Sequence, residues 1–176
     1  MTRPALVVVG PPASGKTTVG RAIAAELRLP FRDTDADVEV ETGTRIADLF
    51  VEQGEPHFRV LEERAVARAL AEHDGVLALG GGAVTSPATR RLLVEHGRSG
   101  GTVIWLDVDV ASAAKRVGLS RDRPLLAVNP RAMLRTMLEA RAPLYAEVAT
   151  VTVSTAGRSI PEVVTEVLAA VGAGAS

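Results

Sequence analysis

The sequence predicts an α/β protein in which helices cover both faces of a mainly parallel sheet, a three-layer α-β-α arrangement with five strands expected. Short runs of β-branched residues alternate along the chain with longer segments of helical periodicity, and this alternation is typical of parallel strands connected by helices. Apolar residues make up 47% of the chain but aromatic residues only 3%, so alanine, valine and leucine must form the core. The length of 176 residues fits one domain.

The strands and helices follow one another in a regular order. In the first helix, Val19, Ile23 and Leu27 recur every four positions and predict a buried stripe. The low-complexity residues 172–176 are expected to form a frayed tail after a domain of residues 1–171. The expected pairs of strand and following helix are 6–9 with 17–27, 76–79 with 86–96, 102–106 with 111–117, and 151–153 with 161–171.

Two segments interrupt this alternation. Residues 33–64 are rich in charge and open with an Asp-Thr-Asp sequence, and residues 112–130 contain Arg121, Arg123 and two prolines without a strong period. Both are expected to be excursions from the sheet. Because ligands of parallel α/β sheets lie beyond the carboxyl ends of the strands, the excursions are predicted to converge over a binding site there.

The composition excludes several classes of function. Twenty Lys and Arg residues stand against 21 Asp and Glu, for a net charge of -1, so no general positive field would draw the protein to nucleic acid or to an anionic membrane. The absence of cysteine excludes disulfides, zinc-thiolate sites and a thiol nucleophile. No apolar stretch approaches the roughly 18 residues of a membrane span, and the histidines lack the spacing of a metal site. We expect a cytoplasmic protein, and a monomer because no long apolar surface is evident.

Residues 10–17 read Gly-Pro-Pro-Ala-Ser-Gly-Lys-Thr and match the pattern G-x-x-x-x-G-K-[ST] of a phosphate-binding P-loop. They follow a predicted strand and open a predicted helix, which is the context that this motif requires. The fold is therefore expected to be of the P-loop NTPase type, with backbone N–H groups and the positive end of the helix facing phosphate. Lys16 would reach the β- and γ-phosphates of ATP, and the Thr17 hydroxyl would ligate Mg²⁺. The residues expected to bind the nucleotide in this segment are Gly10, Ala13, Ser14, Gly15, Lys16, Thr17 and Thr18.

A P-loop serves many classes of enzyme, so the substrate must be inferred from other residues. Five further motifs follow in order: Asp33-Thr34-Asp35, Gly54-Glu55-x-x-Phe58-Arg59-x-x-Glu62, Gly80-Gly81-Gly82, Arg123-Pro124-Leu125-Leu126 and Arg141-Ala142-Pro143-Leu144-Tyr145. This series spans most of the chain and resembles the shikimate kinase family, which belongs to the nucleoside-monophosphate-kinase-like P-loop folds. The combination is specific although no single motif is.

The resemblance implies that the chain transfers the γ-phosphoryl group of ATP to the 3-hydroxyl of shikimate, giving shikimate 3-phosphate and ADP in chorismate and aromatic amino acid biosynthesis. Phosphorylation of an alcohol needs a carboxylate that orients the hydroxyl and accepts its proton, and Asp35 matches the family's carboxylate for this role. Asp33 matches the residue that helps to hold Mg²⁺ through water, together with Thr17. The predicted catalytic residues are Asp35, Lys16 and Arg123.

The resemblance also implies which residues hold the substrate. A carboxylate is held best by guanidinium groups, whose paired N–H donors match its two oxygens, and Arg59 and Arg141 occupy the family's positions for this contact. Glu62 lies one helical turn after Arg59 and would hold that guanidinium in place. A glycine triplet after a strand would let the substrate approach the backbone closely. The other positions matched to the pocket are Gly80, Gly81, Gly82, Phe50 and Phe58.

In the family, the second excursion is a lid that closes over ATP. Arg123 would bring its charge to the transferring phosphoryl group as the lid shuts out water. Arg116 and Arg158, with Pro161, match the positions that enclose the adenine base. One departure from the family pattern is Ala13, which stands where a glycine is usual.

Two other readings are open from the residues alone. Another P-loop metabolite kinase, such as a gluconate kinase, shares the loop and the size but should lack the combined Asp-Thr-Asp, Gly-Gly-Gly and Arg-Pro-Leu-Leu series. A nucleotide-binding switch without a small substrate would need neither paired arginines nor a carboxylate placed for a third molecule. A nucleic-acid-binding ATPase is disfavoured by the near-zero net charge and the few aromatic residues.

Overall fold

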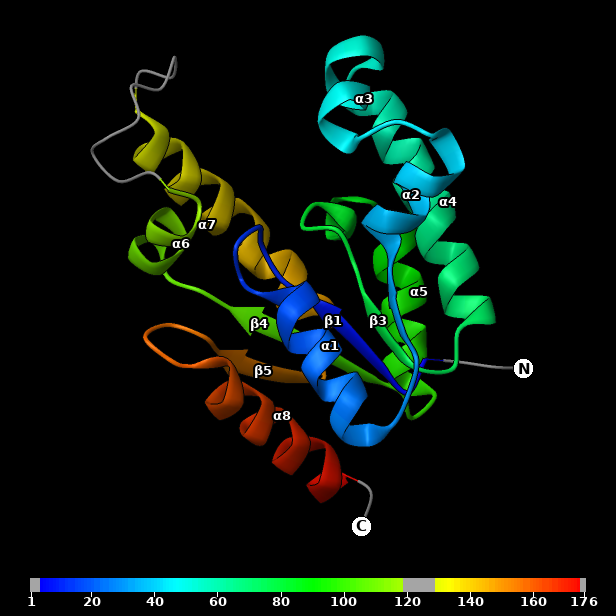
Figure 1. Ribbon diagram of the computed structural model, residues 1–176, viewed down its shortest axis with the longest axis vertical. Coiled ribbons are helices and arrows are strands. Elements are labelled where there is room, and N and C mark those ends of the chain that lie inside the picture. Colours follow the sequence, from blue (N-terminus) through cyan, green and yellow to red (C-terminus); the bar gives the residue numbers. More distant parts are fainter. Residues whose placement is uncertain (1–3, 119–128, 175–176) are drawn as a thin grey trace.

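The computed structural model describes residues 4–118 and 129–174, and it confirms the α/β fold and the parallel sheet (Figure 1). All four pairings between neighbouring strands are parallel. The sheet has the spatial order β2-β3-β1-β4-β5, with β1 (Leu6–Val9), β2 (Phe31–Asp33), β3 (Val76–Ala78), β4 (Thr102–Asp107) and β5 (Val151–Ser154).

Helices connect the strands and begin where the sequence supplies caps. Asp33, Ser86 and Asn129 each accept a hydrogen bond from a backbone N–H in the first turn of the helix that follows, which is the preferred chemistry at this position. The helices are α1 (Lys16–Leu27), α2 (Thr34–Thr42), α3 (Ile46–Gln53), α4 (Glu55–Glu72), α5 (Pro87–Arg98), α6 (Val110–Arg116), α7 (Pro130–Val148) and α8 (Ile160–Gly174), with a 3-10 turn η1 (Ala83–Thr85).

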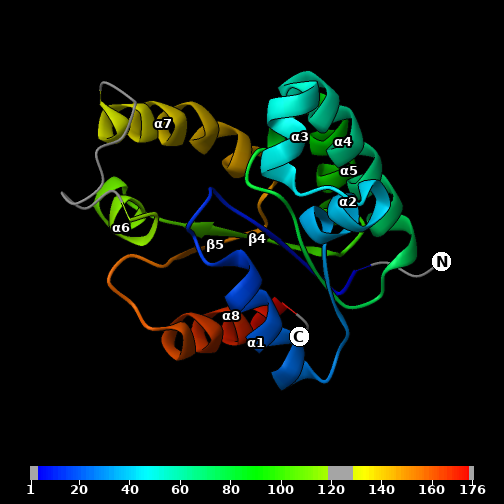
Figure 2. The same cartoon turned by 45° about the horizontal axis from the view of Figure 1, so that its top comes forward.

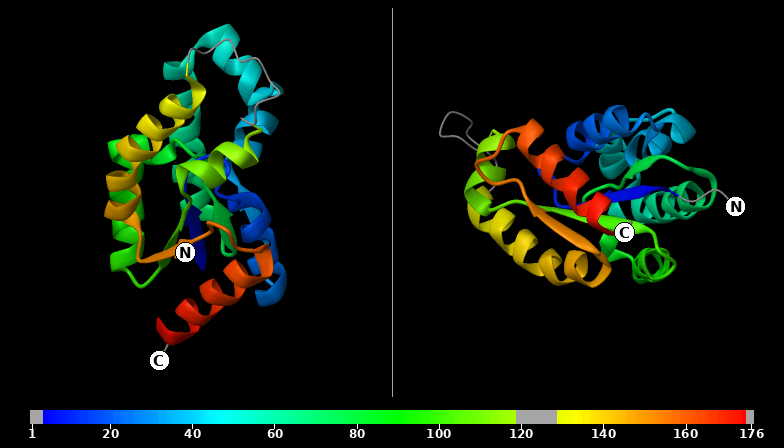
Figure 3. Two further views of the ribbon diagram at one scale, coloured as in Figure 1. Left: turned by 90° about the vertical axis from the view of Figure 1, so that its left-hand side faces the viewer. Right: turned by 90° about the horizontal axis from the view of Figure 1, so that it is seen from below.

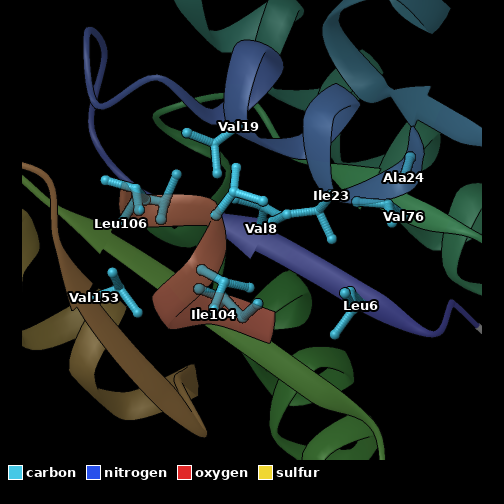
Figure 4. Packing of buried hydrophobic residues seen from close by; sticks show 12 residues of the cluster. Leu6, Val8, Val19, Ile23, Ala24, Val76, Ile104, Leu106 and Val153 are labelled. Carbon is cyan, nitrogen blue, oxygen red and sulfur yellow. The ribbon is translucent and has the colours of Figure 1, made fainter. Parts of the chain in front are cut away.

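The central strand β1 is buried on both faces. Leu6 and Val8 pack in one hydrophobic cluster with residues of α1 and α8 (Figure 4). Val7 and Val9 pack on the other face in a second cluster with residues of α4, α5 and α7. Figure 3 shows the sheet between these two layers. The strand therefore reads as an uninterrupted apolar run, as buried parallel strands do.

The strand register brings three segments to one edge of the sheet. Val8 of β1 lies opposite Ala78 of β3, and Asp33 of β2 lies opposite the same Ala78. The P-loop after β1, the glycine triplet after β3 and the Asp-Thr-Asp sequence at the end of β2 therefore leave the sheet side by side. This is the edge where ligands bind in parallel α/β folds.

The predicted excursion of residues 33–64 consists of α2, α3 and the first half of α4. It has a small core of its own, made of Val38, Leu49, Phe58 and Ala65. Figures 1 and 2 show α2 and α3 on one side of the P-loop and α6 with the start of α7 on the other. Residues 119–128 of the predicted lid, including Arg121 and Arg123, lie outside the described residues.

The described part of the chain contains no helix that is both long and apolar enough to span a membrane. Helix α8 continues to Gly174, so it includes the first residues of the segment for which the sequence predicts a frayed tail.

Candidate active site

The P-loop has the backbone conformation that its glycines predict. Gly15 has a φ of 90°, in the region that disfavours side chains. A Cβ atom on Gly10 would lie 2.6 Å from the carbonyl oxygen of Leu106, so glycine is needed there to let the loop pass. Ala13 also has a positive φ, of 65°, which explains why glycine is the usual residue at this position. Ser14 has a buried hydroxyl with no hydrogen-bond partner in the described residues.

Lys16 and Thr17 begin α1 and face the same site. The Lys16 ammonium donates to the carbonyl oxygen of Pro11 at 2.9 Å. Burial lowers the pKa of Lys16 to about 8, and the charges of Asp35 and Asp33 oppose this shift. A lysine in such a site binds anionic phosphate strongly because little water competes for its charge. Thr18 follows in the same turn and is exposed.

Asp33 serves two local contacts at once. Its Oδ2 atom accepts a hydrogen bond of 2.8 Å from the Thr17 hydroxyl, and its Oδ1 atom accepts one of 3.0 Å from the backbone N–H of Asp35. The first contact brings together the two residues predicted to hold Mg²⁺. The second contact caps α2, so Asp35 lies in the first turn of this helix.

Asp35 is held in a setting that favours its neutral form. Burial, followed by the charges of Asp33 and Glu62, raises the pKa of Asp35 to about 6 against the opposing charge of Lys16. The Oδ1 atom of Asp35 is buried and has no hydrogen-bond partner among the described residues. A poorly solvated carboxylate is a stronger base than one in water, so Asp35 is suited to accept a proton from a substrate hydroxyl.

Arg59 is held by two carboxylates of its own helix. Its Nη1 atom donates to Glu62 at 2.7 Å, and its Nη2 and Nε atoms donate to Glu55 at 2.9 and 3.2 Å. The guanidinium also lies 5.3 Å from the ring centroid of Phe58 and 6.0 Å from that of Phe50. The two rings are 4.8 Å apart. These contacts fix the direction of the guanidinium, and Glu55 is a partner to which the sequence analysis assigned no role.

Arg141 extends into the same site from α7. Its positive charge lowers the pKa of Lys16, and it also opposes the rise that burial causes in the pKa of Glu62. Such effects require short distances, because charge interactions weaken as separation grows. The charge of Arg141 therefore acts on both Glu62 and Lys16, although the three residues come from three different helices.

The glycine triplet lies between these side chains. A Cβ atom on Gly80 would be 2.5 Å from both Asp35 Oδ1 and Glu62 Oε2. On Gly82 it would be 2.2 Å from Arg59 Nη1. The backbone thus passes through the centre of the site, where any larger residue would displace a charged group.

Thr34 fastens the triplet from the side of α2. Its side chain is fully buried, and its hydroxyl accepts a hydrogen bond of 3.3 Å from the backbone N–H of Gly80. No role was predicted for Thr34, and the only sequence signal for one is its position between Asp33 and Asp35.

The predicted adenine contacts lie on the other side of the P-loop. Arg116 donates to the carbonyl oxygen of Ala13 at 3.0 Å and to the carbonyl and hydroxyl oxygens of Thr155 at 2.8 and 3.0 Å. It therefore joins the P-loop to the loop after β5. Arg158 donates to the carbonyl oxygen of Ser154 and pairs with Glu166 of α8. The adenine roles of both arginines stay predictions, as does the role of Arg123.

The fold and the site together define a P-loop kinase, in which a phosphate-binding loop faces a carboxylate and two arginines. Residues 12–172 match the family model described as "Shikimate kinase". The chain is 54% identical over 170 residues to a shikimate kinase of Salinispora arenicola, covering 97% of this chain and 99% of that protein. It is 57% identical over 155 residues to a shikimate kinase of Saccharopolyspora erythraea, covering 88% and 86% of the two chains.

A solved structure agrees with these relatives. A shikimate kinase from Acinetobacter baumannii in complex with shikimate has a TM-score of 0.87 and 33% identity, covering 98% of this chain and 94% of that one. The chain belongs to the shikimate kinase family. The gluconate kinase and nucleotide-switch readings are therefore set aside, and the chain is an ATP-dependent kinase.

Proposed function

We propose that this protein phosphorylates shikimate, transferring the γ-phosphoryl group of ATP to the 3-hydroxyl and releasing ADP and shikimate 3-phosphate. Family membership supports the acceptor and its 3-hydroxyl. The observation that carries the proposal is the position of Gly80 between Asp35 and Glu62. A Cβ atom built on Gly80 would lie 2.5 Å from a carboxylate oxygen of each, and the charge of Asp35 acts on Lys16 of the P-loop. A small polyhydroxy acid placed there would reach Asp35 with a hydroxyl and the arginines with its carboxylate.

Each residue has a role that follows from its surroundings. Arg59 and Arg141 would hold the substrate carboxylate from two helices, and the Glu55 and Glu62 contacts keep Arg59 in one orientation. Asp35 would accept the proton of the attacking hydroxyl, because its oxygen is buried and its pKa is raised to about 6. Catalysis would then come mainly from positioning and from stabilising negative charge on the phosphoryl group.

Lys16 and the P-loop would hold the other reactant. The ammonium group lies in a site of low solvation, where its charge acts strongly on the β- and γ-phosphates. Transfer would be direct, without a covalent enzyme intermediate, because the phosphate site and the carboxylate site adjoin. Arg123 is proposed to add a further positive charge from the lid.

The Thr17 and Asp33 side chains suit Mg²⁺ as donors. Their oxygens are 2.8 Å apart, and hard oxygen ligands are those that Mg²⁺ prefers. The described residues contain no cluster of three or more histidine, cysteine or acidic side chains that would form a protein cage for a metal. We propose a site completed by water and phosphate, which is usual for Mg²⁺. When bound, the ion would neutralise charge on the phosphates.

A coupled assay of ATP consumption tests the proposed activity. The purified protein is supplied with ATP and Mg²⁺, and then separately with shikimate, gluconate, nucleoside monophosphates or no acceptor. We expect ADP formation with shikimate alone, and phosphorus NMR of the product should locate the new ester on the 3-hydroxyl. Turnover with gluconate, or an equal rate without any acceptor, would contradict the proposal.

The carboxylate-binding role of Arg59 has a matched control on the same helix. Arg59→Ala should lower kcat/KM for shikimate by about 30- to 1,000-fold, since a charge-assisted bidentate contact is worth about 2 to 4 kcal/mol. Arg68→Ala removes an exposed pair with Glu41 and should change kcat/KM less than about twofold. If a substrate analogue without the carboxylate suffers the same loss in Arg59→Ala, then Arg59 has another role.

We further propose a cytoplasmic, monomeric enzyme with no nucleic-acid or membrane partner. The net charge of -1 supports the absence of an electrostatic attraction to polyanions. Light scattering after size-exclusion chromatography should give a mass near 18.4 kDa. A mass of twice that value would contradict the monomer.

A further inference from the structure

The tyrosine of α7 touches three parts of the molecule. Tyr145 is 1% exposed, and its hydroxyl donates a hydrogen bond of 2.5 Å to the carbonyl oxygen of Gly81. Its ring stacks on Trp105 of β4, with 5.7 Å between the centroids and 26° between the planes. Arg141 precedes it by one helical turn on the same side of α7. Burial raises the pKa of Tyr145 to about 12, and a hydrogen bond and the charge of Arg141 oppose this rise.

We infer that Tyr145 is a positioning residue, whose hydroxyl fixes the distance between Arg141 and the glycine triplet and so sets the width of the pocket for the acceptor. The inference rests on the proposed function, because it concerns how the same pocket holds its substrate. Tyr145 itself is not assigned a contact with substrate.

The surroundings of Gly81 leave its backbone little freedom on the other side. A Cβ atom on Gly81 would lie 2.7 Å from Cδ of Pro12 in the P-loop. Movement of the triplet toward the P-loop is therefore blocked, and the Tyr145 hydroxyl limits movement away from α7. The neighbouring glycines adjoin Asp35 and Arg59, so a shift at Gly81 would change the space around both side chains.

The helix needs this contact at the turn that carries Arg141. Pro143 lies inside α7 between Arg141 and Tyr145. Proline has no backbone N–H, so this turn lacks the hydrogen bond that would run back to residue 139. A bond from the Tyr145 hydroxyl to another segment compensates by holding the turn from outside. Arg141 is carried on this same turn.

The hydroxyl can be separated from the ring experimentally. The ring belongs to the hydrophobic cluster below the sheet, together with Leu93 and Val148, and phenylalanine would keep that packing. Tyr145→Phe therefore removes the bond of the hydroxyl to Gly81 and its contact with Arg141, and keeps the packing of the ring. A matched control is Thr150→Val, which removes a hydroxyl that contacts the backbone of Val103 at the opposite end of β4.

Steady-state kinetics give the first test. Tyr145→Phe should raise KM for shikimate about 5- to 20-fold, the factor expected for loss of one buried hydrogen bond. The kcat should fall less than about threefold and KM for ATP should change less than about twofold, because the P-loop contacts remain. Both variants should lower the melting temperature by similar amounts, because each loses buried hydrogen bonds. Thr150→Val should leave both KM values unchanged.

The sole tryptophan of the chain provides a second test, whose first part uses the unmodified protein. Trp105 stacks on Tyr145, so a carboxylate that binds Arg141 should alter Trp105 emission in the unmodified protein. Shikimate should produce the change, and an analogue without the carboxylate should not. In Tyr145→Phe the change at saturation should fall to less than about half, because the link from pocket to ring is weakened.

Three results would overturn the inference. One is an unchanged KM for shikimate in a folded Tyr145→Phe, even with a lower melting temperature, since Tyr145 would then be structural only. Another is an equal rise in KM for ATP and shikimate. The third is Trp105 emission in the unmodified protein that does not respond to saturating shikimate. Failure of the unmodified protein to phosphorylate shikimate is a different result, which would refute the proposed function itself.

Discussion

Replacement of Asp35 by asparagine should stabilise the folded protein at neutral pH while removing most of its activity. Burial, followed by the charges of Asp33 and Glu62, raises the pKa of Asp35 from 3.8 to about 6. A carboxyl group with a raised pKa binds its proton more tightly in the folded state than in the unfolded chain, so the free energy of unfolding falls as pH rises from about 4 to about 6. At 1.36 kcal/mol for each pH unit between the two pKa values, the ionised carboxylate costs about 3 kcal/mol above pH 7.

Asparagine is neutral at every pH and so avoids this cost. The free energy of unfolding of Asp35→Asn should exceed that of the unmodified protein by up to about 3 kcal/mol at pH 7.5 and by about half as much at pH 5. The attraction of Lys16 is already included in this pKa, and partial solvent screening of the site reduces the gain, so we expect about 1 to 3 kcal/mol at pH 7.5. The kcat should fall by about 10² to 10⁴ with nucleotide affinity nearly unchanged.

Urea unfolding at pH 5 and pH 7.5 measures the effect. Asp48→Asn is the matched control, because it removes a carboxylate that pairs with Arg45 at 3.1 Å on the surface, and it should change stability by less than about 1 kcal/mol at both pH values. The reasoning is refuted if Asp35→Asn is no more stable than the unmodified protein at pH 7.5. A gain of the same size at both pH values would also refute it, because the raised pKa requires the gain to shrink as pH falls.

Two further predictions concern the reaction. A plot of kcat/KM against pH should be bell-shaped, falling below about pH 6 as Asp35 gains a proton and above about pH 8 as Lys16 loses one. In a plot of kcat the alkaline fall should occur at higher pH, since bound phosphates favour charged lysine. A flat profile from pH 5 to 9 would contradict both roles. Gly82→Ala should raise KM for shikimate at least about tenfold, because its Cβ would meet Arg59 Nη1 at 2.2 Å, whereas Gly172→Ala, which has open space, should behave as the unmodified protein in the same assay.

The sequence predicted those parts of the fold that have local signals. β-Branched runs and four-residue periodicity are contained within single segments, so four strands and the helices after them could be located. The strand β2 was missed because Phe31-Arg32-Asp33 has no β-branched residue. Its extended conformation comes from pairing with β3, a partner that lies far along the chain.

The candidate site shows the same division. The P-loop motif and the order of the later motifs indicated which residues to consider, and the structure brings the P-loop, Asp35, Arg59 and Arg141 together. The contact between Glu62 and Arg59 was predicted, because one helical turn separates the two residues. The supporting contacts between distant segments could not be predicted, because they are bonds between side chain and backbone. Thr34 reaches Gly80 across 46 positions and Tyr145 reaches Gly81 across 64. No local pattern distinguishes such a threonine or tyrosine from one that only fills the core.

The two carboxylate oxygens of Asp33 make different contacts, one with the backbone and one with a side chain. Oδ1 caps α2, whereas Oδ2 is paired with a hydroxyl that can rotate away. A cation held at Oδ2, as proposed above, would therefore leave the cap of α2 intact. The position of Asp35 would then not depend on whether the cation is bound.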